Sequence, residues 1–183
     1  VGNHDVTLNT KGFAKLGSLT SIDNGTLQAV NGVYLRGGSV LAGSGTVAAK
    51  LAAGFSSTIE DTGDLDLGST SNVSGFFSDG ELIVDTHMVT IYDQNKAVLG
   101  SVTDLGSETD GGTLVAANGL LIEQGKDLVG RGLVTGDLVN QGNVYGDSDD
   151  MEGRLVFDVG HTVSGIGSFT NVQFNGTYSP GLS

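Results

Sequence analysis

The sequence contains no cysteine, no tryptophan and a single proline, and aromatic residues make up only 6% of its 183 positions. The lack of cysteine excludes a disulfide-stabilised scaffold and leaves the redox compartment open. Apolar runs never exceed four residues, which excludes a transmembrane helix and a signal-peptide core within this sequence. The chain has the length of one domain or of two small ones.

Basic residues are also scarce. Eight Lys and Arg stand against 21 Asp and Glu, which gives a net charge of −13, and the sequence contains no basic cluster. Nucleic acids and anionic membranes both require a positive footprint, so we expect neither as a partner and no direct membrane insertion. The balance is compatible with a soluble extracellular protein and with loosely held divalent cations.

Glycine, by contrast, supplies 31 residues. A helical bundle is disfavoured because each interior glycine costs a helix about 1 kcal/mol relative to alanine. Many of the glycines belong to an internal repeat: residues 25–47 align without a gap with residues 112–134, and 11 of the 23 positions are identical. A weaker upstream match at an offset of 83 extends the alignment, so the sequence predicts two copies of one unit, residues 1–83 and 84–183.

Two smaller motifs mark corners. The pattern apolar-x-Gly-x-Gly-x-apolar occurs at residues 41–47, 128–134 and 163–169, and Asn-Gly or Asp-Gly pairs precede short runs of alternating apolar residues. Such glycines supply the backbone conformations that turn a chain between strands. The predicted corner glycines are Gly25, Gly32, Gly43, Gly45, Gly112, Gly119, Gly130, Gly132, Gly165 and Gly167. Between corners the apolar residues recur with a period of two, which indicates strands with one buried face.

A tandem unit of short strands favours a β-solenoid over a sandwich or a propeller. A sandwich does not require a tandem repeat, and propeller blades repeat at about 40–50 residues with aromatic signatures that are absent here. We therefore predict an all-β, right-handed parallel β-helix of about eight rungs, with about 20–25 residues per rung and a length on the order of 40 Å. Ala48–Ala53 is assigned as strand despite its alanines, because its aligned partner Thr135–Asn140 does not favour a helix.

Three phrases carry a resemblance to known proteins. They lie at residues 43–47 (GSGTV), 162–169 (TVSGIGSF) and 175–181 (NGTYSPG). They are similar to the repeats of bacterial autotransporter passengers, and still more to those of PEP-CTERM-associated β-strand-repeat surface proteins. The resemblance implies a secreted protein of a bacterial cell surface or matrix with a β-solenoid body. The sorting signal, membrane anchor or translocator barrel of such proteins is not found in this sequence.

The acidic segment 147–152 is the candidate metal site. Its four carboxylates come from Asp147, Asp149, Asp150 and Glu152. Calcium prefers several flexible oxygen ligands, so the segment is a candidate calcium site. The spacing matches neither an EF-hand nor the glycine-rich nonapeptide of calcium-binding β-rolls, and a solvated acidic loop is the competing interpretation. No other cofactor is indicated.

Catalytic signals are weak. His4 and His87 occupy equivalent positions in the two units and could stack on one face to hold a metal, or could reflect only the repeat. No cysteine or histidine spacing matches a zinc site. Enzymes that cleave polysaccharides on this architecture need convergent carboxylates or a basic residue beside a uronate, and no charged residue recurs between the units in that way. We do not expect an enzyme.

These observations predict a secreted structural β-solenoid that builds an extracellular filament, matrix or surface layer. Neither end of the sequence contains a recognisable cap, so the chain is interpreted either as part of a longer array or as a unit whose exposed strand edges pair end to end with other copies. One alternative is an adhesin stalk that binds a cell-surface glycan. A polysaccharide-active enzyme dependent on Asp149 or Asp150 is the third hypothesis.

Overall fold

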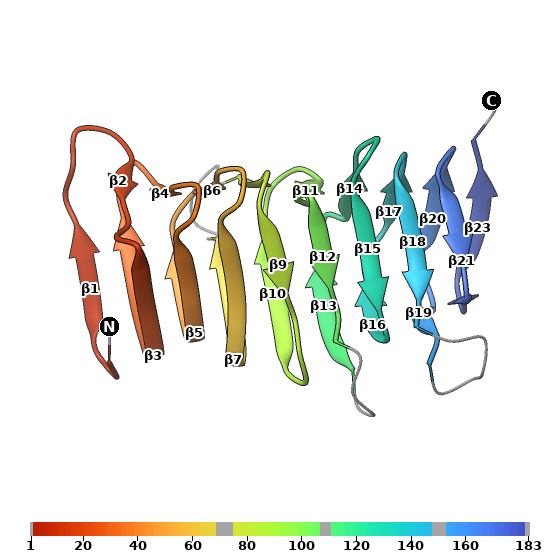
Figure 1. The fold of residues 1–183 in the computed structure, drawn as a ribbon, viewed down its shortest axis with the longest axis horizontal. Helices are drawn as coiled ribbons and strands as arrows, with labels where there is room; N and C mark the ends of the chain where they lie inside the picture. The colour runs from red at the N-terminus through yellow and green to blue at the C-terminus, as the bar shows by residue number, and fades with distance from the viewer. Residues whose placement is uncertain (1, 69–74, 107–110, 148–152, 182–183) are drawn as a thin grey trace.

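The fold was analysed in a computed structural model, which describes residues 2–68, 75–106, 111–147 and 153–181. These residues form strands and turns without a helix, and every strand pair is parallel. The strands stack along one axis from the N-terminal end to the C-terminal end (Figure 1). The predicted all-β parallel solenoid is confirmed. Each turn of the coil crosses three flat faces, which we number in the order in which the chain first meets them.

Face one begins with the first strand of the chain. It comprises β1 (Asp5–Leu8), the second parts of β3 (Leu19–Ala29), β5 (Val40–Ala48) and β7 (Thr58–Gly68), and then β10 (Met88–Tyr92), β13 (Gly112–Ala116), β16 (Gly132–Thr135), β19 (Leu155–Phe157) and β22 (Val172–Phe174).

Face two is a separate sheet of nine short strands. It comprises β2 (Ala14–Lys15), β4 (Val33–Leu35), β6 (Leu51–Ala53), β8 (Phe76–Ser78), β11 (Ala97–Val98), β14 (Leu120–Ile122), β17 (Leu138–Asn140), β20 (Thr162–Gly165) and β23 (Thr177–Pro180). Ala48–Ala53, assigned as strand from the repeat, contains the end of β5 and all of β6, but Ala49 and Lys50 between them turn the one–two corner and are not strand.

Face three precedes face one in the next turn. It comprises the first parts of β3, β5 and β7, followed by β9 (Glu81–Ile83), β12 (Val102–Asp104), β15 (Asp127–Gly130), β18 (Asn143–Gly146) and β21 (Ser168–Thr170). Because β3, β5 and β7 run through the corner between faces three and one with only a shift in register, these two faces form one continuous sheet.

The register shows how the coil winds. Stacked partners are 15 residues apart at Thr162 and Thr177 and 25 apart at Met88 and Thr113, so the longer turns match the predicted 20–25 residues and the shorter ones fall below it. The eight strands described on face three span seven turns, which roughly matches the predicted rung number. Nine strands on face two, spaced by about 4.8 Å, make a rod about 38 Å long.

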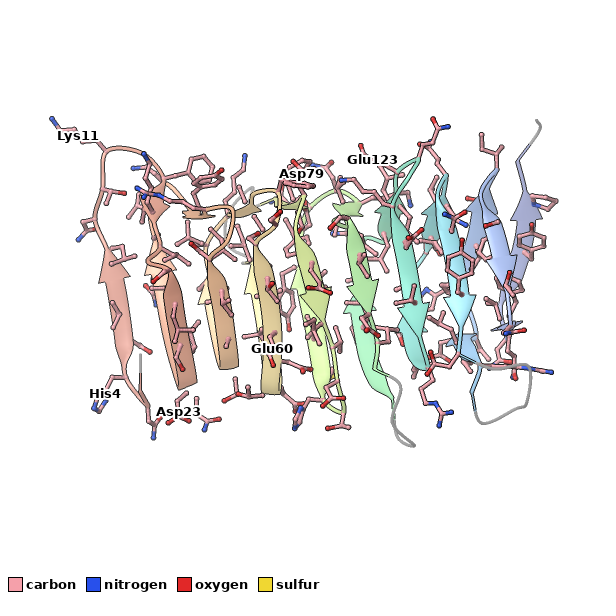
Figure 2. The ribbon with its side chains drawn as sticks, in the orientation of Figure 1. His4, Lys11, Asp23, Glu60, Asp79 and Glu123 are labelled. Atoms are coloured by element: carbon pink, nitrogen blue, oxygen red, sulfur yellow. The ribbon has the colours of Figure 1, made fainter. Side chains whose placement is uncertain are left out.

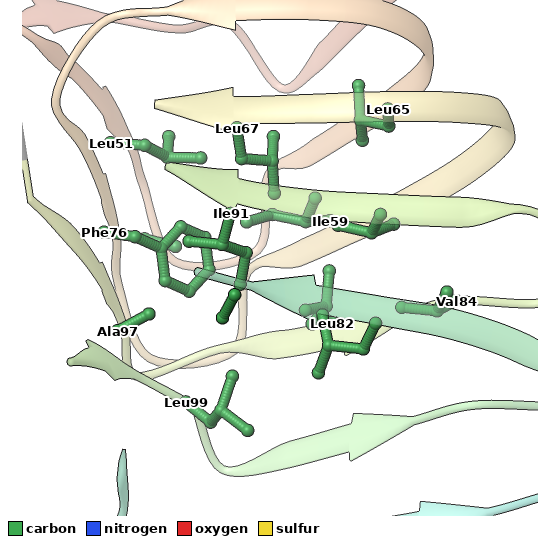
Figure 3. Packing of buried hydrophobic residues seen from close by; sticks show 14 of the residues in the cluster. Leu51, Ile59, Leu65, Leu67, Phe76, Leu82, Val84, Ile91, Ala97 and Leu99 are labelled. Atoms are coloured by element: carbon green, nitrogen blue, oxygen red, sulfur yellow. The ribbon is translucent and has the colours of Figure 1, made fainter. Parts of the chain in front are cut away.

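The core runs along the axis of the coil. Side chains from the three faces point inward and stack on their equivalents in the next turn, and most are completely buried. Figure 3 shows one section of this core, in which the ring of Phe76 lies between Leu51 and Ala97 on face two. A large ring next to a small alanine keeps the interior filled without voids. The stacked apolar columns are therefore the main source of stability.

The two aligned segments occupy equivalent places in the coil. Both 25–47 and 112–134 start on face one, cross face two and reach the next strand of face one. They are separated by four turns, because face one runs from β3 through β5, β7 and β10 to β13. The repeat in the sequence therefore corresponds to a repeat of four turns in space.

Candidate functional site

The predicted corner glycines lie at three different corners. Gly25, Gly43, Gly45, Gly112, Gly130 and Gly132 lie at or next to the three–one corner, Gly32 and Gly119 at the one–two corner, and Gly165 and Gly167 at the two–three corner. The third Gly-x-Gly motif thus turns a different corner from the first two. Its glycines leave room for Asn140 of the preceding turn, whose atoms a Cβ at either position would meet.

The acidic segment is mostly outside the described residues. Asp149, Asp150 and Glu152 fall in the undescribed stretch 148–152, so calcium binding stays a prediction. Asp147 is described, and its Oδ2 lies 3.8 Å from Nε of Arg131. Over the described parts of the chain, no group of three or more His, Asp or Glu side chains is placed to hold a metal ion.

The two equivalent histidines are far apart. His4 precedes β1 and His87 precedes β10, which lie four turns from each other on face one. At a strand spacing of about 4.8 Å this separation is close to 19 Å, so the pair cannot share one metal ion. His87 instead lies beside Asp61, with Nδ1 of the histidine 3.9 Å from Oδ1 of the carboxylate.

Asp61 is the most buried acid that the structure describes. Its residue is only 4% exposed, Oδ1 accepts a hydrogen bond from the backbone N–H of Asp85 at 3.0 Å, and Oδ2 has no partner. Burial raises the pKa of Asp61 above its ordinary value of 3.8, against the opposing effects of the Asp85 hydrogen bond and of His87. The site is a buried carboxylate beside a histidine, and the neighbouring acids Asp85 and Glu60 raise the pKa of Asp61 further.

The outer surface of face three is acidic. One carboxylate projects from each of four successive strands: Glu60 on β7, Glu81 on β9, Asp104 on β12 and Asp127 on β15. Figure 2 shows Glu60 on the side of the rod away from Asp79 and Glu123. The other outward positions of these four strands are Thr58, Ile83, Val102 and Val129. Face three therefore presents alternating carboxylates and mostly apolar side chains, without a basic residue on its strands.

The outer surface of face two is apolar. One outward position per strand stacks from turn to turn, and the register column comprises Lys15, Tyr34, Ala52, Phe77, Val98, Leu121 and Val139, followed by the polar Ser164 and Ser179 at the C-terminal end. Phe77 is 40% exposed and the middle members of the column are half-buried. An apolar column on the outside of a sheet is typical of an interaction surface.

Basic and aromatic side chains flank the N-terminal half of that column. Phe13 and Lys50 lie at the one–two corner, with Nζ of Lys50 5.6 Å from the ring centroid. Arg36 and Phe55 lie at the two–three corner, and Phe55 is 76% exposed. Residues 6–59 contain four basic residues and one acid, a net charge of +3, so the rest of the chain carries −16. The rod is thus basic toward one end and acidic over the remainder.

In the middle of face two, the charge of Lys126 is neutralised by two carboxylates of the same chain. Nζ of Lys126 lies 3.1 Å from Asp79 and 3.3 Å from Glu123, and 5.7 Å from the ring of Phe77. Among the described residues, Lys15, Arg36 and Lys50 make no such ion pair. Cations without an ion pair among the described residues are therefore concentrated at the N-terminal part of the face, and Lys96, just before β11, is a further one beside its middle.

The C-terminal end of the core is aromatic. The ring centroids of Phe174 and Tyr178 are 4.9 Å apart, and Phe169 packs edge-on against both at 5.2 and 5.7 Å. Tyr178 is 46% exposed. In the described part of the chain, the outer edges of β22 and β23 at this end, and of β1 and β2 at the other, pair with no strand.

Comparison with family models, with curated protein sequences and with solved structures finds no match for this chain. Across the described segments, no helix has the length and apolarity needed to cross a membrane. The faces and ends of the rod are therefore the features from which a function can be argued.

Sequence reasoning missed the separation of chemistry between faces. The residues that define each face are visible in the sequence, but their alignment is not. Lys15, Tyr34 and Ala52 fall into one column only when the register between turns is known. A change of one residue in any turn would move them out of line.

Proposed function

We propose that this protein is a secreted structural rod that builds an extracellular filament, matrix or surface layer by stacking end to end. The two ends of the coil carry the proposal. Each presents unpaired strand edges beside the end of the apolar core. A strand edge is a template for another strand, and copies with the same twist and spacing supply a matching one. Location outside the cell rests on the sequence resemblance alone.

The sizes of the side chains at the two ends are complementary. On face two the inward column starts at Ala14 and finishes at Tyr178, and on face three it starts at Thr20 and finishes at Phe169. If the C-terminal end of one copy stacks on the N-terminal end of the next, aromatic rings meet small side chains. Such a head-to-tail contact does not close on itself and gives open filaments.

Electron microscopy of the purified chain, with sedimentation velocity over a range of concentrations, tests this proposal. We expect filaments whose length increases with concentration. Tyr178→Glu places a charge at the proposed junction and should raise the concentration needed for assembly at least about tenfold. Val159→Glu is the matched control, because Val159 is an exposed side chain at the one–two corner, away from the end of the core.

Two results would count against end-to-end stacking. One is a population of dispersed short rods at every concentration. The other is equal assembly by the Tyr178→Glu and Val159→Glu variants, which would show that filaments form through a surface other than the aromatic end.

A further inference from the structure

We propose that the outer surface of face two of one copy packs laterally on the outer surface of face three of a second copy. The inference deepens the proposed structural function, because it names the contact that would join filaments side by side. It uses surfaces that the end-to-end contact does not use. The two contacts can therefore fail separately.

Face two supplies an apolar centre with basic edges. Tyr34, Ala52 and Phe77 form consecutive steps of its outward column, and Arg36 and Lys50 are exposed at the corners on either side. Aromatic and arginine side chains are enriched at the centres of protein interfaces. Both cations lack a carboxylate partner within the described residues, so they are available to an acidic partner.

Face three supplies the complement. The side-chain carboxylates of Glu60 and Glu81 form no hydrogen bond or ion pair with any described residue. Asp104 accepts one hydrogen bond from the backbone N–H of Gly106, and Asp127 accepts one from the side chain of Asn143. Each of the latter carboxylates keeps a second oxygen for a partner. The apolar side chains between them can pack against the apolar column of face two.

The spacing of the charges matches. Lys15, Arg36 and Lys50 come from three successive turns at face two, and Glu60, Glu81 and Asp104 come from three successive turns at face three. Along the axis both sets advance by one strand spacing of about 4.8 Å per charge, while across the axis Arg36 and Lys50 lie at opposite corners and Glu81 is offset by two residues from the column of Glu60 and Asp104. Two parallel or antiparallel rods can thus pair several charges at once, and wrong registers place cations opposite apolar side chains.

The apolar column of face two favours a protein partner over a hydrated polyanion. An acidic polysaccharide or a nucleic acid could neutralise the three cations, but it would leave Val98, Leu121 and Val139 uncovered. A second copy covers the aliphatic side chains and the cations together, and its acidic face is a part of this same chain. Sheets pack face to face at a separation of about 10 Å, and side chains from the two facing surfaces fill this space by interdigitating.

A single contact of this kind is small. The column from Lys15 to Val139 spans seven strands and is about 29 Å long, and a strip one side chain wide buries less area than a standard stable interface. We expect the contact to weaken as salt rises, because its charged pairs are at the rim. Repetition of the contact along a filament increases the overall affinity between two filaments and so stabilises bundles.

Charge reversal tests the proposal. The basic-face variant is Lys15→Glu/Arg36→Glu/Lys50→Glu, and the acidic-face variant is Glu60→Lys/Glu81→Lys/Asp104→Lys. Each variant alone has two like-charged faces, so lateral association measured by sedimentation velocity at low salt should fall at least about tenfold. An equimolar mixture pairs the intact acidic face of one variant with the intact basic face of the other, and should regain association.

Controls separate this contact from the ends and from unfolding. Asp5→Lys/Asp23→Lys changes charge outside both faces and should leave lateral association at least as strong as in the unaltered chain. The milder Lys15→Gln/Arg36→Gln/Lys50→Gln variant keeps the test available if a reversed variant fails to fold, and it too should weaken association. In micrographs, the face variants should form filaments of normal length that do not bundle, whereas Tyr178→Glu should shorten filaments.

Three outcomes would overturn the proposal. The first is a mixture that associates no better than either reversed variant alone. The second is an unaltered chain that shows no lateral association at low salt. The third is a chain that binds polygalacturonate or single-stranded DNA through the three cations without lateral association, which would assign the basic patch to a polyanion.

Discussion

At the scale of single residues, backbone crowding at the three–one corner selects glycine. Gly130 has a φ of +100°, and a Cβ at this position would lie 2.5 Å from the carbonyl oxygen of Gly106. At the equivalent Gly43, a Cβ would overlap the carbonyl oxygen of Ile22 in the turn beneath. The neighbouring turn passes too close for any side chain. The recurring Gly-x-Gly of the sequence is thus a consequence of stacking.

Gly130→Val is expected to destabilise the fold by about 3 kcal/mol, because it adds a left-handed strain of about 1–2 kcal/mol to overpacking of about 1–3 kcal/mol. Thermal melting should show a midpoint lower by roughly 6–12 °C. Gly12→Ala is the control, since a Cβ at Gly12 meets nothing within 4 Å. Equal melting of the two variants would show that the corner is looser than the structure indicates.

Asp61 gives a pH dependence that can be isolated by substitution. Burial raises its pKa in the folded state above 3.8, so the folded protein holds this proton more tightly than the unfolded chain. The stabilisation is complete below the ordinary pKa and is lost as pH rises through the raised value. Compared with Asp61→Asn, the unaltered protein should therefore lose stability as pH rises above 3.8, measured by urea unfolding at several pH values. The assignment of this pH dependence to Asp61 would be contradicted if the free energy of unfolding varied with pH in the same way for the unaltered protein and Asp61→Asn. It would also be contradicted if Asp5→Asn changed the pH dependence as much as Asp61→Asn.

At the scale of elements, the shortness of the strands gives each face its chemistry. A three-residue strand such as β6 buries two side chains and exposes only Ala52. One residue per turn therefore decides what face two presents, and a column of such residues becomes a surface. The corners hold the remaining polar groups. Asn140 at the end of β17 is completely buried and connects two turns.

Asn140→Ala should cost about 2 kcal/mol, because it leaves the N–H of buried Gly142 without a partner at about 1–3 kcal/mol, whereas the carbonyl of exposed Ser168 can bond to water. Its Oδ1 accepts the N–H of Gly142 and its Nδ2 donates to the carbonyl of Ser168, both at 3.0 Å. Chemical denaturation measures the loss, and Asn95→Ala at an exposed position is the control. A loss no greater than that of the control would mean that water replaces the amide.

At the scale of the whole molecule, the rod is asymmetric along its axis and around it. Its charge changes from +3 in residues 6–59 to −16 elsewhere, and its apolar and acidic surfaces lie on different faces. A uniform net charge of −13 would make copies repel through their sides. The uneven distribution permits lateral contact between unlike faces, while the aromatic C-terminal end offers a contact along the axis.

The sequence by itself determined the solenoid. Apolar residues with a period of two and glycines at aligned positions are sufficient for this, because stacking imposes the same local requirement on every turn. The strand at Leu51–Ala53 followed from the repeat even though its alanines favour a helix. Only the tertiary structure decided which residues share a face. Turns of 15 to 25 residues shift the alignment unpredictably, so the column from Lys15 to Val139 and the carboxylates from Glu60 to Asp127 exist only once each turn has fixed its register against the next.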